Sequence, residues 1–212
     1  MTDKLNVGVI LEWHPFDVRH FYEMLWSMDD VAAYVQPWDI FVQDPARSSY
    51  DVVLYYNMSF PVPPADDARR LYVERELGKT GQGIVLLHHG VLSYETWKPW
   101  DEVSGTTDRG FTYHQGERIA TTVADREHPI TAGVSDFSLV DESYEMPEPA
   151  SDNHILLTTD NPLSPHAIAW TRTYGESRVF CYLSGHDNSA WSSPEFRRVL
   201  HQGLLWAAQR PE

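Results

Sequence analysis

The strongest indication of the fold in this sequence is the segment GQGIVLLHHG, residues 81–90. Positions 84–87 are all apolar, and an apolar run without alternation is typical of a strand covered on both faces of a parallel sheet. Two histidines and a glycine follow the run directly. Because ligands bind beyond the carboxyl ends of the strands in open parallel sheets, the segment predicts a buried central strand that ends at a polar site.

Similar patterns on both sides of this segment predict strands that alternate with helices. The predicted strands lie at 5–11, 31–35, 51–56, 81–87, 118–123, 154–158, 167–171 and 179–183. Apolar residues at helical spacing predict helices at 15–28, at 66–78 and from Pro194 onward, with Ser193 as the N-cap. The sequence therefore predicts an α/β fold with one mostly parallel sheet, helices on both faces, and a single domain over residues 1–212.

The middle of the chain is less regular. Residues 93–116 are rich in tryptophan, glycine, threonine and charge, and they are predicted to form a long loop with one short helix. Loops of this length inside compact domains are often lids or binding loops.

Composition narrows the classes of partner. Lys and Arg number 16 and Asp and Glu number 31, so the 212-residue chain carries a formal net charge of −15, which disfavours nucleic acid and anionic membranes as partners. A single cysteine, Cys181, excludes an internal disulfide and fits a reducing compartment. No apolar run is long enough to span a membrane, and the first residues lack the features of a signal peptide. We therefore expect a cytoplasmic protein, with tryptophan-rich loops that fit self-association into a homo-oligomer.

Polar side chains follow four of the predicted strands. Because the carboxyl ends of parallel strands share one edge of a sheet, we expect these side chains to line a common pocket. They are Trp13 and His14 after the first strand, Asn57 after the third, His88 and His89 after the fourth, and His186 and Asp187 after the last. Successive strand residues point to opposite faces, so one of His88 and His89 should enter the pocket, with His89 slightly preferred. The alternative is that these histidines are ordinary core or edge residues.

Acidic candidates come from the segment DESYE, residues 141–145. A run of acidic residues is most often a solvated loop, but Asp141 and Glu142 could orient a histidine or bind sugar hydroxyl groups. Histidine and carboxylate together are also ligands for a divalent metal such as Zn²⁺. The sequence has no HExxH or similarly spaced ligand pair, so it does not define a metal site.

Aromatic residues are frequent near the same edge. Trp13, Trp97 and Trp191 are predicted to lie in or beside loops, and aromatic faces suit the C–H faces of sugar rings. The alternative is that these tryptophans pack in the core or in a lid. Cys181 lies inside a predicted strand and so is not expected to be a nucleophile.

Four segments make the sequence resemble the trehalose-utilisation, or ThuA-like, family. They are GQGIVLLHHG (81–90), HPITAGVSDF (128–137), DESYEMPEP (141–149) and, most specific, residues 169–208 with their RVF and GHD motifs. The resemblance implies a flavodoxin-like fold of the class I glutamine amidotransferase-like superfamily. It also implies loss of the amidotransferase nucleophile, because residues 88–90 read HHG where related enzymes carry a cysteine on the elbow after a central strand.

The resemblance also suggests the function. His89 or His88, Asp141, Glu142 and His186 fall on recurring polar positions of the family, whereas the N-terminal loop EWHPFDVRH departs from its glycine-rich version. The family is associated with disaccharide catabolism through 3-keto sugars. It implies a carbohydrate-catabolism protein that acts as a keto-sugar lyase, hydrolase or isomerase and is not a functional glutamine amidotransferase.

A ketone at C3 of a sugar acidifies the proton on C2, because the resulting carbanion is an enolate. We expect His89 or His186 to remove this proton and Asp141 or Glu142 to orient the base, while a second imidazole or a metal stabilises the enolate oxygen. Two other functions stay open: a non-catalytic carbohydrate-binding module, and a metal-dependent hydrolase of another small molecule.

Overall fold

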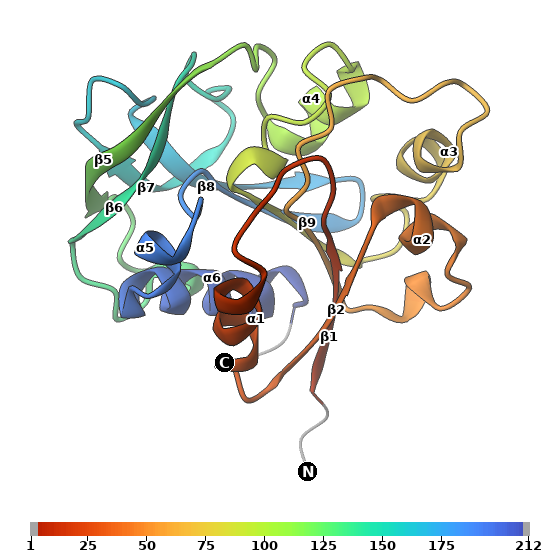
Figure 1. The fold of residues 1–212 in the computed structure, drawn as a ribbon, viewed down its shortest axis with the longest axis horizontal. Coiled ribbons are helices and arrows are strands. Elements are labelled where there is room, and N and C mark those ends of the chain that lie inside the picture. The colour runs from red at the N-terminus through yellow and green to blue at the C-terminus, as the bar shows by residue number, and fades with distance from the viewer. Residues whose placement is uncertain (1–3, 210–212) are drawn as a thin grey trace.

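The computed structural model describes residues 4–209, and the nine strands of this part form one sheet (Figure 1). The strand order is β2-β1-β3-β4-β9-β8-β7-β5-β6. In chain order the strands are β1 Leu5–Ile10, β2 Val31–Gln36, β3 Val52–Tyr55, β4 Gly83–Leu87, β5 Thr112–Val123, β6 Phe137–Glu145, β7 His154–Thr159, β8 Ala167–Tyr174 and β9 Ser177–Tyr182. The sheet has a parallel half, β2 to β9, and an antiparallel half, β9 to β6.

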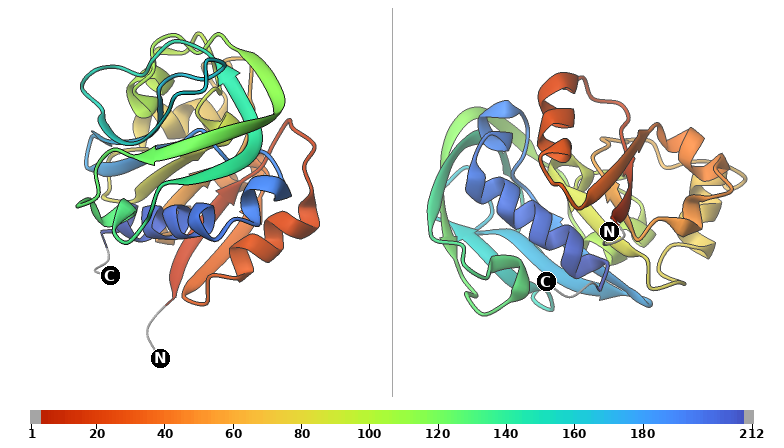
Figure 2. Two further views of the ribbon diagram at one scale, coloured as in Figure 1. Left: turned by 90° about the vertical axis from the view of Figure 1, so that its left-hand side faces the viewer. Right: turned by 90° about the horizontal axis from the view of Figure 1, so that it is seen from below.

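Helices cover both faces of the sheet (Figure 2). On one face lie α1 Val18–Trp26, α5 Asn188–Trp191 and α6 Pro194–Ala207, and α6 contacts β4 and β9. On the other face lie α2 Trp38–Gln43, α3 Ala68–Arg75 and α4 Lys98–Ser104. The described residues also form three 3₁₀ turns, η1 Arg47–Ser49, η2 His88–Gly90 and η3 Pro129–Thr131. Within residues 4–209, no helix has the length and apolar character needed to cross a bilayer.

The predicted α/β architecture is confirmed, and its strongest local signals are the ones that form as expected. Every residue of β4 is fully or almost fully buried, as its unbroken apolar run predicts for a central strand. Helix α6 begins where the sequence places it, because the Ser193 side chain accepts a hydrogen bond from the Phe196 N–H and Pro194 occupies the first turn.

Two segments differ from the sequence prediction. Residues 93–116, expected to form a loop with one short helix, contain α4 and also the first residues of β5. The acidic segment 141–145 is the end of strand β6 and not a solvated loop, and Asp141, Glu142, Ser143 and Tyr144 are buried. The apolar alternation that marks a strand is missing here because the inward-facing side chains are polar.

The antiparallel half of the sheet curls, which brings its edge strand back towards the centre of the molecule. Strands β5 and β6 form a long ribbon whose register shifts between His114 and Glu117, and Gly116 there has a φ of 72°. Such a bulge bends a strand pair and increases its twist. Although β6 is the edge strand, the Asp141 carboxylate reaches the loop after β9 and accepts the Gly185 N–H. The ribbon therefore delivers β6 side chains to the ends of β4 and β9.

The turn after β4 is tight. A Cβ on Gly90 would lie 2.2 Å from the Tyr55 carbonyl oxygen of the neighbouring strand β3, so only glycine fits. His88 has a φ of 52°, in the left-handed region that residues with a side chain rarely adopt. Such strain clusters at functional sites, where the surrounding structure holds it in place.

Candidate functional site

Four histidines gather at the carboxyl ends of the parallel strands. The ring centroids of His14 and His89 are 4.5 Å apart, those of His14 and His186 and of His88 and His186 are both 5.4 Å apart, and those of His88 and His89 are 5.1 Å apart. They come from the segments after β1, β4 and β9, which are distant in sequence. The structure thus brings together the histidines that the strand ends predict to be neighbours.

His88 and His89 lie on the same side of the sheet edge, contrary to the alternation expected of strand residues. Strand β4 ends at Leu87, and both histidines belong to the 3₁₀ turn η2, where the alternation no longer applies. Both are fully buried, so neither is preferred for the open pocket. His88 lies against Glu142, and His89 lies against His14 and the Tyr56 ring, 4.3 Å between centroids.

The tautomer of neutral His88 is fixed by its hydrogen bonds. Its Nδ1 lies 2.7 Å from the Leu183 carbonyl oxygen, and a carbonyl only accepts, so Nδ1 carries the proton. The lone pair of Nε2 is then free to accept the Tyr144 hydroxyl at 2.6 Å. Tyr144 was not predicted as a site residue, although it lies on β6 two residues after Glu142, on the same side of the strand by alternation.

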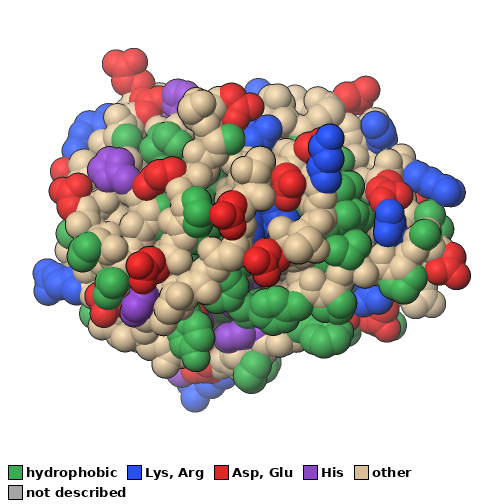
Figure 3. Space-filling view, turned by 90° about the horizontal axis from the view of Figure 1, so that it is seen from above, with side chains coloured by type: hydrophobic (Ala, Val, Ile, Leu, Met, Phe, Trp, Pro, Cys, Tyr) green, Lys and Arg blue, Asp and Glu red, His purple; other side chains and the backbone are tan. Residues whose placement is uncertain are grey.

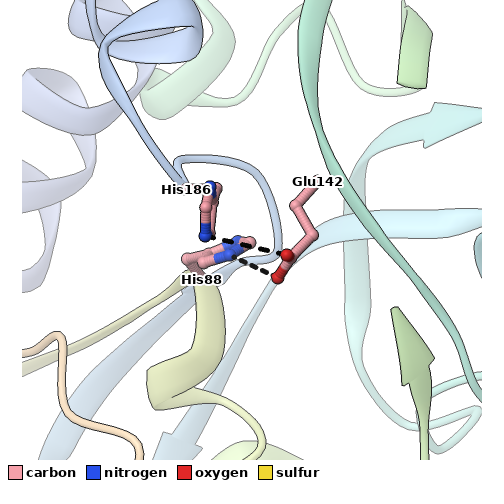
Figure 4. A group of neighbouring side chains, drawn as sticks. All are labelled: His88, Glu142 and His186. Carbon is pink, nitrogen blue, oxygen red and sulfur yellow. Dashed lines mark ion pairs between the residues drawn. The ribbon is translucent and has the colours of Figure 1, made fainter. Parts of the chain in front are cut away.

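Glu142 lies between two of the histidines (Figure 4). Its Oε1 is 3.5 Å from His88 Nε2, its Oε2 is 3.6 Å from His186 Nε2, and the Gln115 side chain donates to Oε2 at 3.2 Å. Burial raises the pKa of Glu142, but His88, His186 and Tyr144 together outweigh burial and lower this pKa to about 2. Glu142 is therefore an anion at neutral pH.

Asp141 faces the backbone of the loop after β9. Its carboxylate accepts the N–H groups of Gly185 at 2.7 Å, His186 at 2.9 Å and Glu142 at 2.9 Å. Burial raises the pKa of Asp141, and His88 and these N–H groups oppose the increase. Of the two predicted carboxylates, Asp141 holds the His186 loop in place, and Glu142 contacts the imidazoles.

His14 and His89 have polar atoms without partners. Among the described residues, neither ring nitrogen of His89 nor the Nδ1 of His14 has a hydrogen-bond partner. Burial lowers the pKa of both imidazoles, and for His14 the neighbouring His186 and His88 lower it further. Both rings are therefore neutral at pH 7, and His14 is the half-buried one of the two.

A pocket of about 130 Å³ opens beside this cluster. Its lining includes Gln115, Glu142, His186, Asp187 and Ser189. The His186 side chain is 18% exposed, and its Nδ1 lies 3.7 Å from Asp187 Oδ2. Gln115 and Ser189 were not predicted from the sequence, because both lie in stretches whose approach to the site depends on the curled ribbon and on α5.

The other residues predicted to contact the substrate do not line this pocket. Trp97 and Trp191 are 5% and 0% exposed and offer no open ring face to a sugar, since Trp97 packs on Tyr94 and Trp191 donates its indole N–H to the Gly185 carbonyl. Asn57 is buried, and its amide donates to Ser59. Trp13 is 59% exposed beside His14, with a φ of 68°. The predicted aromatic platform is therefore reduced to Trp13, because the other two rings fill the core.

Cys181 is buried in β9, away from the turn after β4, and burial raises the pKa of its thiol. It is the only cysteine of the chain, so no thiol stands at the amidotransferase position. The face at the top of Figure 1 is drawn in Figure 3, which shows acidic and basic side chains interspersed over it and no continuous basic surface.

The lowered pKa of Glu142 predicts a change of stability with pH. A carboxylate whose pKa is lower in the folded than in the unfolded protein adds stability above its unfolded pKa, and this stability is lost as the pH falls through the folded pKa. Glu142 should therefore stabilise the fold above about pH 4.5 and lose this effect towards about pH 2. Urea unfolding of the wild type and Glu142→Gln at several pH values should show a stability difference that shrinks across this window. A difference independent of pH would contradict the ion pairing of Glu142.

Comparisons with known proteins agree with this architecture. The profile of the ThuA family, described as trehalose utilisation, matches residues 30–207. No curated protein matches the chain. A structure of a protein described as ThuA-like from Parabacteroides merdae is similar with a TM-score of 0.76 and 18% identity, over 97% of this chain and 90% of that one.

Two further structures are similar across almost their whole lengths. A cytoplasmic protein from Salmonella typhimurium has a TM-score of 0.70 and 15% identity, over 95% of this chain and 98% of that one. A protein from Thermoplasma acidophilum, described as part of a GMP synthase, has a TM-score of 0.58 and 11% identity, over 96% and 94%. At these identities the likeness shows the fold alone, and the profile carries the family assignment. The chain belongs to the ThuA family of trehalose utilisation, and this membership supports a carbohydrate-related role.

Proposed function

We propose that this protein acts on a keto-sugar by removing the proton from the carbon next to the ketone. The observation that carries the proposal is the cluster of four imidazoles, two of which contact Glu142, beside a small pocket that Glu142 and His186 line. Proton abstraction needs a neutral base and a hydrogen-bond donor that stabilises the developing oxyanion. In this cluster His14 can be the base and His186 the donor. Family membership favours a carbohydrate substrate.

His14 is the base in this proposal. Its lowered pKa keeps the ring neutral and able to accept a proton, and it is half-buried, whereas His89 is sealed in the interior. The sequence favours His89 or His186 as the base. His89 is fully buried, and His186 lies between the carboxylates of Glu142 and Asp187, which suits it to donate a hydrogen bond.

His186 is the group that polarises the ketone. A ring N–H directed at the carbonyl oxygen stabilises the negative charge that develops there as the C2 proton leaves. The proton passes to His14, and the C2–H electron pair becomes part of an enolate whose charge lies on the C3 oxygen. The enolate then expels the C1 substituent as an alkoxide, which takes up the proton held by His14, while a C1–C2 double bond forms; this elimination cleaves the glycoside. Alternatively, the enolate takes a proton at the opposite face of C2, which gives the C2 epimer. Glu142 Oε2 lies 3.6 Å from His186 Nε2, and its negative charge favours this orientation of the ring.

Proton exchange with solvent tests the proposal directly. The full chain is incubated in D₂O with a methyl 3-keto-glucoside or with the parent methyl glucoside, and deuterium at C2 is followed by NMR. We expect exchange of the keto-sugar above the rate in buffer and no exchange of the parent glucoside, because only the ketone acidifies the C2 proton. His201→Ala, which removes a histidine on α6 that pairs with Asp30, is the control and should exchange at the wild-type rate.

The outcomes separate the alternative functions. Saturable binding of either sugar without exchange or cleavage would support a carbohydrate-binding module. Neither binding nor exchange with any keto-glucoside would contradict the proposal and leave a hydrolase of another small molecule.

A further inference from the structure

His88, Glu142 and His186 present ligand atoms to a single point, although they come from η2, β6 and the loop after β9 (Figure 4). One nitrogen from each histidine and one oxygen from the carboxylate all lie within 4.8 Å of one another. We infer that these three side chains bind a divalent transition-metal ion, with Zn²⁺ as the best match. The ion would polarise the ketone together with the His186 ring N–H, and this role rests on the proposed function.

Two separations, each between a histidine nitrogen and a different oxygen of Glu142, suit a metal ion. Two ligand atoms at ~2.0–2.2 Å from Zn²⁺ in tetrahedral geometry are ~3.3–3.6 Å apart. His88 Nε2 and Glu142 Oε1 are 3.5 Å apart, and His186 Nε2 and Glu142 Oε2 are 3.6 Å apart. Both distances are longer than a normal hydrogen bond, which is what a pair held around an ion requires.

The orientation of His88 is that of a metal ligand. Histidine ligands usually donate their other ring N–H to a carbonyl or carboxylate, which fixes the tautomer and directs the lone pair at the metal. His88 Nδ1 donates to the Leu183 carbonyl at 2.7 Å, so the lone pair is on Nε2, which lies 3.5 Å from Glu142 Oε1. The Tyr144 hydroxyl, which contacts Nε2 at 2.6 Å, lies close enough to Glu142 to donate to that carboxylate when an ion takes the lone pair.

The charge of the site calls for a cation. Within residues 4–209, the ion pairs of Glu142 are with histidines and with no lysine or arginine. Burying a carboxylate without a full positive charge beside it is costly. A divalent ion supplies that charge and leaves both imidazoles neutral, which is the form that binds metal.

The cluster also leaves room for further ligands of the ion. Catalytic zinc sites use three protein ligands and keep a position open for water or substrate. Glu142 and His186 both line the pocket of about 130 Å³, so that position can face it. Independently, both nitrogens of buried His89 and the Nδ1 of His14 lack partners in the described part of the chain, and a hydrated ion would supply polar atoms next to them. Two imidazoles and one carboxylate select a transition metal over Mg²⁺ or Ca²⁺, which prefer oxygen ligands.

Metal binding is tested with Co²⁺ as a coloured probe. The full chain is treated with EDTA, dialysed and titrated with Co²⁺ while its visible absorption is recorded, and bound Co²⁺ is then displaced with Zn²⁺. We expect a single ion per chain. Glu142→Gln, which keeps the shape of the side chain, and His186→Ala should each weaken binding more than about 100-fold, since even residues that only support metal ligands cost 10–100-fold. Circular dichroism of each metal-free variant checks that it is folded.

His154→Ala is the matched control. His154 Nε2 lies 2.8 Å from Asp125, and the His154 ring is 5.5 Å from the His128 ring. His154, Asp125 and His128 therefore form another group of histidines and a carboxylate that could bind Co²⁺. Loss of Co²⁺ binding in His154→Ala but not in Glu142→Gln, or no binding by the wild type, would overturn the inference.

The two proposals can fail separately. Glu142-dependent Co²⁺ binding without C2 exchange of any keto-sugar would leave the metal site and remove the proposed function. C2 exchange at full rate by EDTA-treated protein that binds no Co²⁺ would leave the proposed function and remove the metal site.

Discussion

His14→Ala should slow exchange of the C2 proton of a 3-keto-glucoside about 10²–10⁴-fold, the range for loss of a positioned general base. Burial, followed by the neighbouring His186 and His88, lowers the pKa of His14, so the wild-type ring is neutral and ready to accept a proton. Its Nδ1 is buried and has no hydrogen-bond partner among the described residues, whereas the residue as a whole is only half-buried, so substrate would meet the exposed side of the ring. The loss should appear in kcat more than in KM, and added imidazole should restore part of the rate.

His20→Ala is the matched control for this prediction. His20 lies in the first turn of α1, only six positions from His14, and its Nδ1 contacts Asp17 at the surface. It should exchange the keto-sugar at the wild-type rate. A wild-type rate in His14→Ala together with a large loss in His186→Ala would return the role of base to His186, one of the two histidines that the sequence favours for it.

Asp141→Ala should destabilise the fold by about 2–4 kcal/mol and also abolish C2 exchange. Its carboxylate accepts three backbone N–H groups, from Gly185, His186 and Glu142, and alanine leaves them without an acceptor. Hydrogen bonds to a charged group are worth about 1.5–3 kcal/mol each, and part of the loss is offset because the buried charge is no longer desolvated. The His186 loop would then lose its anchor to β6, and the imidazole would no longer face Glu142. Urea unfolding measures the first effect, and NMR exchange measures the second.

Asp136→Ala is the control for this variant. Asp136 also accepts a backbone N–H, from Val123 at 2.9 Å, but it is exposed and pairs with Arg126. Water can replace an exposed acceptor, so the loss of stability should be clearly smaller and exchange should be unaffected. Equal destabilisation by the two substitutions would contradict the anchoring role of Asp141.

The strand ends could be predicted from the sequence because their signals are local. The apolar run 84–87 marks β4, and the polar residues directly after β1, β4 and β9 must reach the same sheet edge once these strands lie parallel. The convergence of His14, His89 and His186 follows from that arrangement. The resemblance to the ThuA family, carried by long motifs, is confirmed by the family profile.

The contacts between side chains from distant segments depend on the tertiary structure. The carboxylates of β6 reach the histidines because the β5–β6 ribbon bends at the bulge near Gly116, and no periodicity in 137–145 signals that long-range contact. Trp97 and Trp191 are buried because neighbouring elements cover them, which their own sequence positions do not specify. Local chemistry encodes a strand and the residues directly after it, whereas contacts between distant segments depend on twist, register and packing that the whole chain sets together.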